Sequence, residues 1–100
     1  MAVKVLMVRS PRDQGDFMEV NRLLHDLRIL AMSQPGYISG ETLLANDAKG
    51  TTLVISKWAS SRHWRDYEAS PKREALTKQL ASCLDGPTRT EVWVESPVIG

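Results

Sequence analysis

Residues 37–58, YISGETLLANDAKGTTLVISKW, hold two strand-like runs on either side of a short polar loop. Residues 37–46 and 51–58 are rich in β-branched and other apolar side chains, which are typical of strands. The loop between them, residues 47–50, ends in glycine, and a loop of this length commonly joins antiparallel neighbours. The stretch therefore predicts a β-hairpin in the middle of the chain.

The residues before the hairpin predict one strand and one helix. Residues 3–9, VKVLMVR, form a short valine-rich run that is typical of a strand. Residues 16–32 carry apolar side chains every three or four positions, which indicates an amphipathic helix. We expect Asp16 to cap this helix, because Glu19 follows it in capping-box spacing. Residues 34–36, Gln-Pro-Gly, are expected to end it.

The residues after the hairpin predict a second helix, in two pieces, and a last strand. A serine at 60 or 61 can cap the helix, and Ser70-Pro71 restarts it with serine as the cap and proline at the first helical position. Apolar residues at helical spacing continue to position 84, and the Asp-Gly-Pro at 85–87 stops them. Residues 88–95 alternate between polar and apolar, as in a strand.

The predicted order is therefore β-α-β-β-α-β, which indicates a ferredoxin-like α+β fold. In this arrangement an antiparallel four-stranded sheet carries both helices on one face, because the crossovers are right-handed. A chain of 100 residues fits one such domain, and we assign residues 1–100 to it.

The strands are apolar on both faces, although the helices can cover only one. In the first strand Val5 and Met7 point one way while Leu6 and Val8 point the other, and residues 51–58 repeat this pattern. Something else must cover the second face, and a two-fold copy of the same chain is the simplest candidate. We therefore expect a homodimer packed sheet to sheet.

Composition and charge exclude several classes of partner. Thirteen basic and 12 acidic residues leave a net charge of +1, which predicts no attraction to nucleic acid or to acidic membranes. Apolar runs long enough for a signal peptide or a membrane span are absent from the sequence, and we expect a cytoplasmic protein. The single cysteine, Cys83, sits among leucines and is expected to be a small buried hydrophobe. No metal-ligand motif includes His25 or His63, and His25 is expected to be solvated.

An aromatic cluster is the most informative feature for function. Trp58, Trp64 and Tyr67 lie within ten residues of one another, and His63 shares a helix face with Tyr67. Packing between the helix and the sheet is the expected role for Trp58. For Tyr67 and His63 the alternative, a pocket, stays open, because each has a polar tip that needs a partner or water.

Two further features have ordinary interpretations. The second helix carries four basic residues with acidic residues interleaved, which predicts a solvated, salt-bridged face: Arg62, Arg65, Lys72 and Arg73 alternate with Asp66, Glu68 and Glu74. Trp93 alternates with charged residues in the last strand, and we expect it at a sheet edge or a subunit contact.

Three short motifs, in their order and spacing, resemble the antibiotic biosynthesis monooxygenase family. They are Pro35-Gly36-Tyr37, the strand end Ser56-Lys57-Trp58-Ala59-Ser60, and Trp64-x-x-Tyr67-x-x-Ser70-Pro71. The resemblance covers residues 3–95 and implies a dimeric α+β barrel, formed by two sheets packed face to face. This implication agrees with the strands that are apolar on both faces.

The family includes cofactor-independent monooxygenases of phenols and quinols, and haem-degrading enzymes. The haem-degrading branch uses an Asn, a Trp and a His, and Met7, Tyr67 and Thr77 stand at those places here, so haem degradation is not expected. Quinol-oxidising members often carry histidines near the Ser-Pro of the second helix, where this chain has Tyr67 and Lys72.

The resemblance implies a monooxygenase that uses no metal or bound flavin and acts on a small aromatic or quinol-like molecule. The expected site residues are His63 as base or hydrogen-bond partner, Tyr67 as donor, Trp58 and Trp64 as stacking walls, Met7 as a substrate contact, and Arg9 as an anion holder or an exposed residue. The alternative is a non-catalytic dimeric module that binds a small ligand with the same fold. Residual haem binding is a third possibility.

Overall fold

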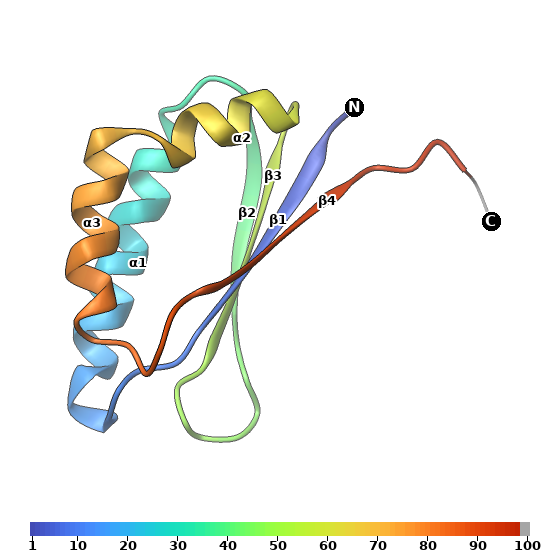
Figure 1. Ribbon diagram of the computed structural model, residues 1–100. Helices are drawn as coiled ribbons and strands as arrows, with labels where there is room; N and C mark the ends of the chain where they lie inside the picture. Colours follow the sequence, from blue (N-terminus) through green and yellow to red (C-terminus); the bar gives the residue numbers. More distant parts are fainter. Residues whose placement is uncertain (99–100) are drawn as a thin grey trace.

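The computed structural model describes residues 1–98 and contains one four-stranded antiparallel sheet with the helices on one face (Figure 1). The elements in chain order are β1 (Val3–Arg9), a 3₁₀ turn (Gln14–Asp16), α1 (Phe17–Met32), β2 (Tyr37–Leu44), β3 (Thr52–Trp58), α2 (Ser61–Glu68), α3 (Pro71–Ala81) and β4 (Arg89–Val94). The ferredoxin-like α+β fold predicted from the sequence is confirmed.

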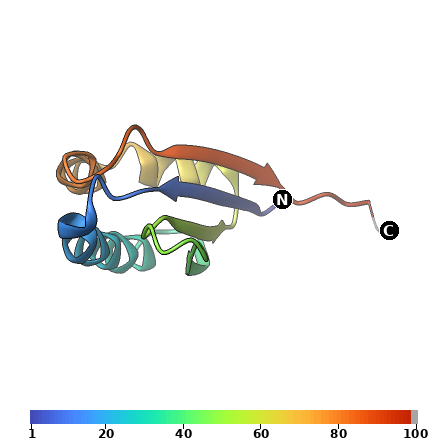
Figure 2. The ribbon, with the colours of Figure 1, turned by 90° about the horizontal axis from the view of Figure 1, so that it is seen from below.

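The strands lie in the order β2-β3-β1-β4, so the first strand is central and the last is at an edge (Figure 2). β2 and β3 form the predicted hairpin, which is closed by a hydrogen bond of 2.9 Å from the Ala45 amide to the Thr51 carbonyl oxygen. The loop is longer than the predicted 47–50, because β2 ends at Leu44. The positive φ of 80° at Gly50 explains the glycine at the end of that loop.

The predicted capping box at Asp16 is wrong. Asp16 has helical backbone angles, φ −86° and ψ −10°, and its side chain makes no capping hydrogen bond. Its carboxylate instead accepts a hydrogen bond of 3.1 Å from Nε of Arg12. The Asp13 carboxylate, which accepts from the Gly15 amide at 2.8 Å, caps the preceding 3₁₀ turn, so α1 begins at Phe17.

The second helical segment is broken as predicted, but it ends earlier. Ser60 caps α2 by accepting a hydrogen bond from the His63 amide, and Pro71 lies in the first turn of α3. α3 ends at Ala81, so Cys83 and Leu84 lie beyond it in a turn rather than in the helix.

That turn is tied to the N-terminal part of the chain. The Arg12 amide donates to the Cys83 carbonyl oxygen at 2.8 Å, and Leu84 is buried while Cys83 is only half-buried. Cys83 is therefore less enclosed than predicted.

The core between the helices and the sheet consists of two clusters of buried side chains. One lies between the sheet, α2 and the end of α1, and contains Val3, Val5, Met7, Ala31, Trp58, Trp64 and Tyr67. The other joins α1 to α3 and contains Val20, Leu23, Leu24, Leu27, Leu80 and Leu84. His25, on the opposite side of α1, is exposed as predicted.

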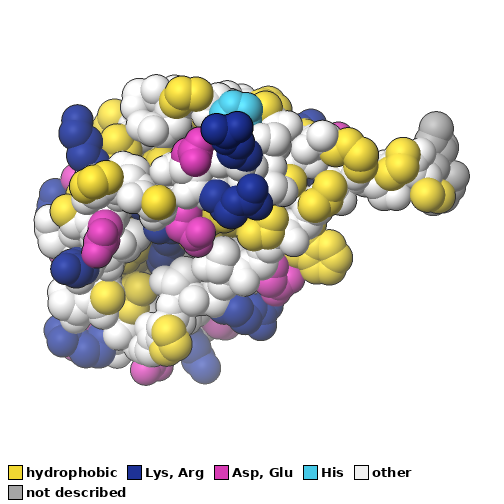
Figure 3. Space-filling model, turned by 45° about the horizontal axis from the view of Figure 1, so that its top comes forward, with side chains coloured by type: hydrophobic (Ala, Val, Ile, Leu, Met, Phe, Trp, Pro, Cys, Tyr) yellow, Lys and Arg dark blue, Asp and Glu magenta, His cyan; other side chains and the backbone are white. Residues whose placement is uncertain are grey.

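The face of the sheet opposite the helices carries apolar side chains that are not fully buried. The register places Leu6 opposite Ile55 and Val8 opposite Leu53, and all four are partly exposed. On the edge strand β4, Trp93 is 59% exposed. Residues 95–98, after β4, lead away from the rest of the molecule and carry further hydrophobic side chains (Figure 3). The prediction of strands that are apolar on both faces is confirmed, as is the edge position of Trp93.

Charged side chains of both signs lie on the surface, and none of the described helices is long and apolar. Basic and acidic side chains are intermixed on the face shown in Figure 3. Within residues 1–98, no helix has the length and hydropathy needed to cross a bilayer.

Candidate functional site

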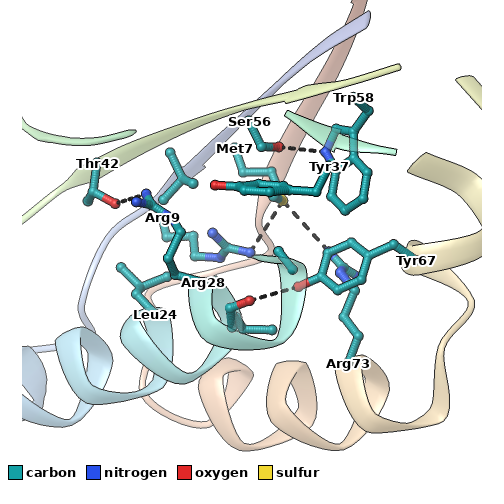
Figure 4. A pocket seen from close by; sticks show the side chains of 13 residues that line it. Met7, Arg9, Leu24, Arg28, Tyr37, Thr42, Ser56, Trp58, Tyr67 and Arg73 are labelled. Atoms are coloured by element: carbon teal, nitrogen blue, oxygen red, sulfur yellow. Dashed lines mark hydrogen bonds between the residues drawn. The ribbon is translucent and has the colours of Figure 1, made fainter. Parts of the chain in front are cut away.

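A small cavity lies between α1 and the helix-facing side of the sheet, and 13 residues line it (Figure 4). They come from β1, β2, β3 and all three α-helices. The space open to the centre of a water molecule is about 40 Å³. This volume has room for a few water molecules, whereas an aromatic ligand would require side chains at the rim to move.

Aromatic rings form one wall of the cavity. Trp58 is fully buried and stacks on Tyr67, with ring centroids 4.9 Å apart and an interplanar angle of 25°. Tyr37 meets the other side of Trp58 edge-on at 5.4 Å. The indole Nε1 of Trp58 donates to Ser56 Oγ at 3.0 Å, so its polar atom is satisfied. Trp58 therefore fills core, as expected, and also faces the cavity.

Tyr67 is held as a protonated donor. Its Oη donates a hydrogen bond of 3.1 Å to the carbonyl oxygen of Leu27 in α1. Burial raises the pKa of Tyr67 above its ordinary value, although the nearby charges of Arg73 and Arg9 oppose the rise. The hydroxyl is consequently neutral near pH 7 and can donate a proton in a hydrogen bond but cannot serve as a base.

Two of the expected site residues do not line the cavity. His63 turns toward the start of its helix, where Nδ1 lies 2.8 Å from Ser60 Oγ. Its ring packs so closely on the backbone of Gly36, which has a φ of +82°, that a Cβ at that position would overlap it. Trp64 is buried behind Tyr67, with ring centroids 5.9 Å apart. His63 and Trp64 therefore pack around the cavity without lining it.

Arg9 is buried in the cavity, so of its two predicted alternatives the exposed position is wrong. The residue is only 4% exposed, and its Nη2 lies 3.3 Å from Met7 Sδ, a weak acceptor. Its Nε has no hydrogen-bond partner among the described residues. Burial, and next the neighbouring charge of Arg73, lower the pKa of Arg9 to about 10.

Arg73 also faces the cavity and not the solvated, salt-bridged surface that the sequence predicted. Its guanidinium carbon lies 5.2 Å from the Trp64 ring centroid and 5.5 Å from that of Tyr67, within the range of cation–π contacts. Its Nη2 lies 3.7 Å from the same Met7 sulfur that Arg9 touches. The two guanidinium groups therefore converge on one thioether (Figure 4).

A third arginine, Arg28 of α1, lies at the edge of the cavity. Its Nη2 donates to Thr42 Oγ1 at 3.0 Å, which links α1 to β2. Gly40 leaves room for this arrangement, because a Cβ there would lie 2.6 Å from Tyr37 Oη and 3.2 Å from Arg28 Nε. Sequence analysis missed Arg28, Tyr37 and Thr42. Arg28 follows Leu24 by four residues in α1, and only this spacing could have indicated that Arg28 borders the buried face of the helix.

The described residues do not suggest a metal or haem site. Within residues 1–98, no three His, Cys, Asp or Glu side chains are close enough together to hold a metal ion. The lining of the cavity contains no histidine to serve as an axial haem ligand. Thr77, at the place of that histidine, donates its hydroxyl hydrogen bond to the Glu74 carbonyl oxygen within α3.

Comparisons with known proteins identify the fold. No model of a known protein family matches the chain, and no curated protein sequence matches it. Solved structures do match over nearly the full length. SnoaB from Streptomyces nogalater, described as a cofactor-independent oxygenase, is 13% identical, with a TM-score of 0.85 over 98% of this chain and 96% of that one.

Two further structures are similar. Rv0793 from Mycobacterium tuberculosis is 17% identical, with a TM-score of 0.87 over 100% of both chains. A structure described as an antibiotic biosynthesis monooxygenase is 13% identical, with a TM-score of 0.84 over 95% of this chain and 99% of that one. The chain therefore has the α+β fold of the antibiotic biosynthesis monooxygenase-like proteins, at identities that are informative about the fold alone.

Proposed function

We propose that this protein is a cofactor-independent monooxygenase that acts on a small aromatic or quinol-like substrate in the cavity beside Tyr67. The observation that carries the proposal is a small cavity with an aromatic wall and cationic side chains. The shared fold with SnoaB, described as a cofactor-independent oxygenase, supports it.

In the proposed reaction the substrate supplies the electrons. A bound phenol or quinol releases its proton to solvent water and passes one electron to O₂, which gives a substrate radical and superoxide that can recombine. The protein binds the substrate, favours its ionised form and shields the radical pair from bulk water. Arg9, Arg28 and Arg73 lower the pKa of a bound hydroxyl, because nearby positive charge stabilises the anion. Trp58 and Tyr67 would hold the ring, while Met7 separates the two deeper guanidinium groups.

One observation favours the non-catalytic alternative, a module that only binds a small ligand. The cavity lining contains no His, Asp or Glu, so it offers no side chain suited to act as a general base near pH 7. His63, the base expected from the sequence, points to Ser60 instead. A catalytic role for His63 stays a prediction that turnover measurements can test.

Oxygen uptake with a panel of phenols, quinols and naphthols tests the function. We expect uptake with at least one of them, and a loss on the order of 100-fold in Arg9→Met, because removal of one group that stabilises a developing anion commonly has such an effect. Arg62→Met, which makes the same change at an exposed position, should keep full turnover. Binding of panel members without uptake would support the alternative and refute the monooxygenase proposal.

We further propose a homodimer packed through the open face of the sheet. Partly exposed apolar side chains of β1 and β3 cover that face, including Leu6, Leu53 and Ile55, and the family resemblance implies the same arrangement. A cytoplasmic location likewise stays a prediction.

Light scattering should give roughly twice the chain mass of 11.2 kDa for the wild type. Ile55→Glu should shift the protein to monomers, because an unpaired charge buried at the interface costs about 3–5 kcal/mol. Ala75→Glu adds the same charge on the exposed side of α3 and should leave the dimer intact. A wild-type mass near that of one chain would refute the dimer.

A further inference from the structure

We propose that the cavity binds a carboxylate, carried by a small aromatic molecule, between the guanidinium groups of Arg9 and Arg73. The inference deepens the proposed function, on which it rests for treating the ligand as a substrate. The binding itself is argued from the cavity alone.

The first observation is that the charge of Arg9 has no counterion among residues 1–98. The residue is 4% exposed, its Nε lacks a hydrogen-bond partner in the described part of the chain, and its Nη2 contacts the sulfur of Met7 at 3.3 Å. Arginine is almost never buried without a partner, because the guanidinium loses its hydration without compensation. The uncompensated charge of a buried guanidinium would be neutralised by an anion that binds from outside the chain.

The second observation is that Arg73 brings another positive charge to the same point. Its Nη2 lies 3.7 Å from the Met7 sulfur, so both arginines approach one atom from different elements, β1 and α3. None of the 13 lining residues is acidic. Like charges in a partly dehydrated site repel, and an anion between them would turn that repulsion into two attractive contacts.

The shape of the site favours a carboxylate over a phosphate. A guanidinium is planar and binds the two oxygens of a carboxylate in parallel hydrogen bonds. The cavity is small, at about 40 Å³, and flat rings of Trp58 and Tyr67 bound it. A planar group that continues into an aromatic ring fits these walls better than a tetrahedral anion does.

An adjoining groove offers space for the rest of the ligand. Leu24, Arg28 and Thr42 line both the cavity and an outer groove of about 180 Å³, which also includes Asn21 and His25. The hydrogen bond of 3.0 Å between Arg28 and Thr42 stands between the two spaces. A ligand that places its carboxylate inside and its ring against Trp58 and Tyr67 can extend the far side of the ring toward the groove once this side-chain contact opens.

Titration calorimetry with benzoate, at constant ionic strength, tests the inference, and the neutral benzamide is the matched probe. We expect benzoate to bind at least about tenfold more tightly than benzamide and inorganic phosphate. Arg9→Met should weaken benzoate binding by about tenfold or more, while Arg62→Met leaves it unchanged. Arg9→Lys keeps the charge but loses the planar fork, and it should recover only part of the affinity.

Other outcomes would overturn the proposal. Equal affinities for benzoate and benzamide would show that the charge is not recognised, and tighter binding of phosphate would refute the carboxylate assignment. If Arg9→Met fails to fold, Arg73→Gln provides the second variant, with the same loss expected. Benzoate binding that is unchanged in the folded variants would also refute the site.

The inference and the proposed function can fail separately. Arginine-dependent benzoate binding with no oxygen uptake by any phenol or quinol would refute the monooxygenase and leave the carboxylate site in place. Oxygen uptake with a panel member, together with benzoate affinity that is unchanged in folded Arg9→Met and Arg73→Gln, would refute the carboxylate site and leave the monooxygenase in place.

Discussion

Trp58→Ala should lower the free energy of unfolding by about 3–5 kcal/mol, because it empties the centre of the aromatic cluster. Trp58 is fully buried and packs against three rings, those of Tyr37, Trp64 and Tyr67, with centroids between 4.9 and 5.9 Å away. Alanine would leave a void at the junction of β3, α2 and the cavity. Urea unfolding followed by circular dichroism measures the change.

Trp58→Phe is the matched control, because it keeps a flat ring in the stack. We expect a smaller loss of about 1–2 kcal/mol, since the variant gives up part of the contact area and the hydrogen bond from Nε1 to Ser56 Oγ. A loss below about 1 kcal/mol for Trp58→Ala would contradict the central position that we assign to this ring. A loss for Trp58→Phe as large as that for Trp58→Ala would show that the hydrogen bond, and not the ring, is the main contribution.

Arg9→Met should raise the free energy of unfolding by about 1–3 kcal/mol, although we expect it to weaken benzoate binding. Burial lowers the pKa of Arg9 from its ordinary value to about 10, which corresponds to a cost of about 3 kcal/mol for keeping the charged form folded. Methionine has a similar length and no charge, so it removes this cost without opening a large void. Urea unfolding of both proteins in ligand-free buffer measures the difference.

The pH dependence of this gain has a definite sign. Because the pKa is lower in the folded state than in the unfolded state, the cost is fully present at every pH below about 10. It is relieved only as the pH rises above about 10, toward the ordinary pKa of an arginine side chain. The difference in the free energy of unfolding between Arg9→Met and the wild type should therefore be constant between about pH 5 and pH 9.

The control variant Arg62→Met should change the free energy of unfolding by less than about 0.5 kcal/mol. Destabilisation by Arg9→Met would show that the charge of Arg9 has a favourable partner within the protein.

Local patterns were sufficient to predict the order of the elements. The hairpin, the amphipathic α1 and the break at Ser70-Pro71 each depend on neighbours in the chain, and the structure contains all three. The capping box failed for a local reason as well, because Arg12 competes for the Asp16 carboxylate and the backbone there is already helical. Helix ends depend on such competing contacts, which spacing alone does not reveal.

The site was harder to predict, because its residues come from separate elements. The alternation of β1 places Arg9 on the same face as Met7, so its burial could have been read from the strand. The position of Arg73 could not, because it depends on the angle at which α3 leaves α2 after Ser70. His63 and Tyr67 do lie one turn apart, yet only Tyr67 faces the cavity. The close contact of His63 with Gly36 explains the difference.

The two guanidinium groups at Met7 also determine the conditions under which this protein should be studied. A space of about 40 Å³ accommodates a small halide ion, and unpaired positive charges attract one. In ordinary saline buffer we therefore expect chloride to compete with any organic acid for the site. The apparent affinity of the site for an organic acid should fall as sodium chloride is added. Screens for substrates are best carried out in a buffer whose anion is too large to enter.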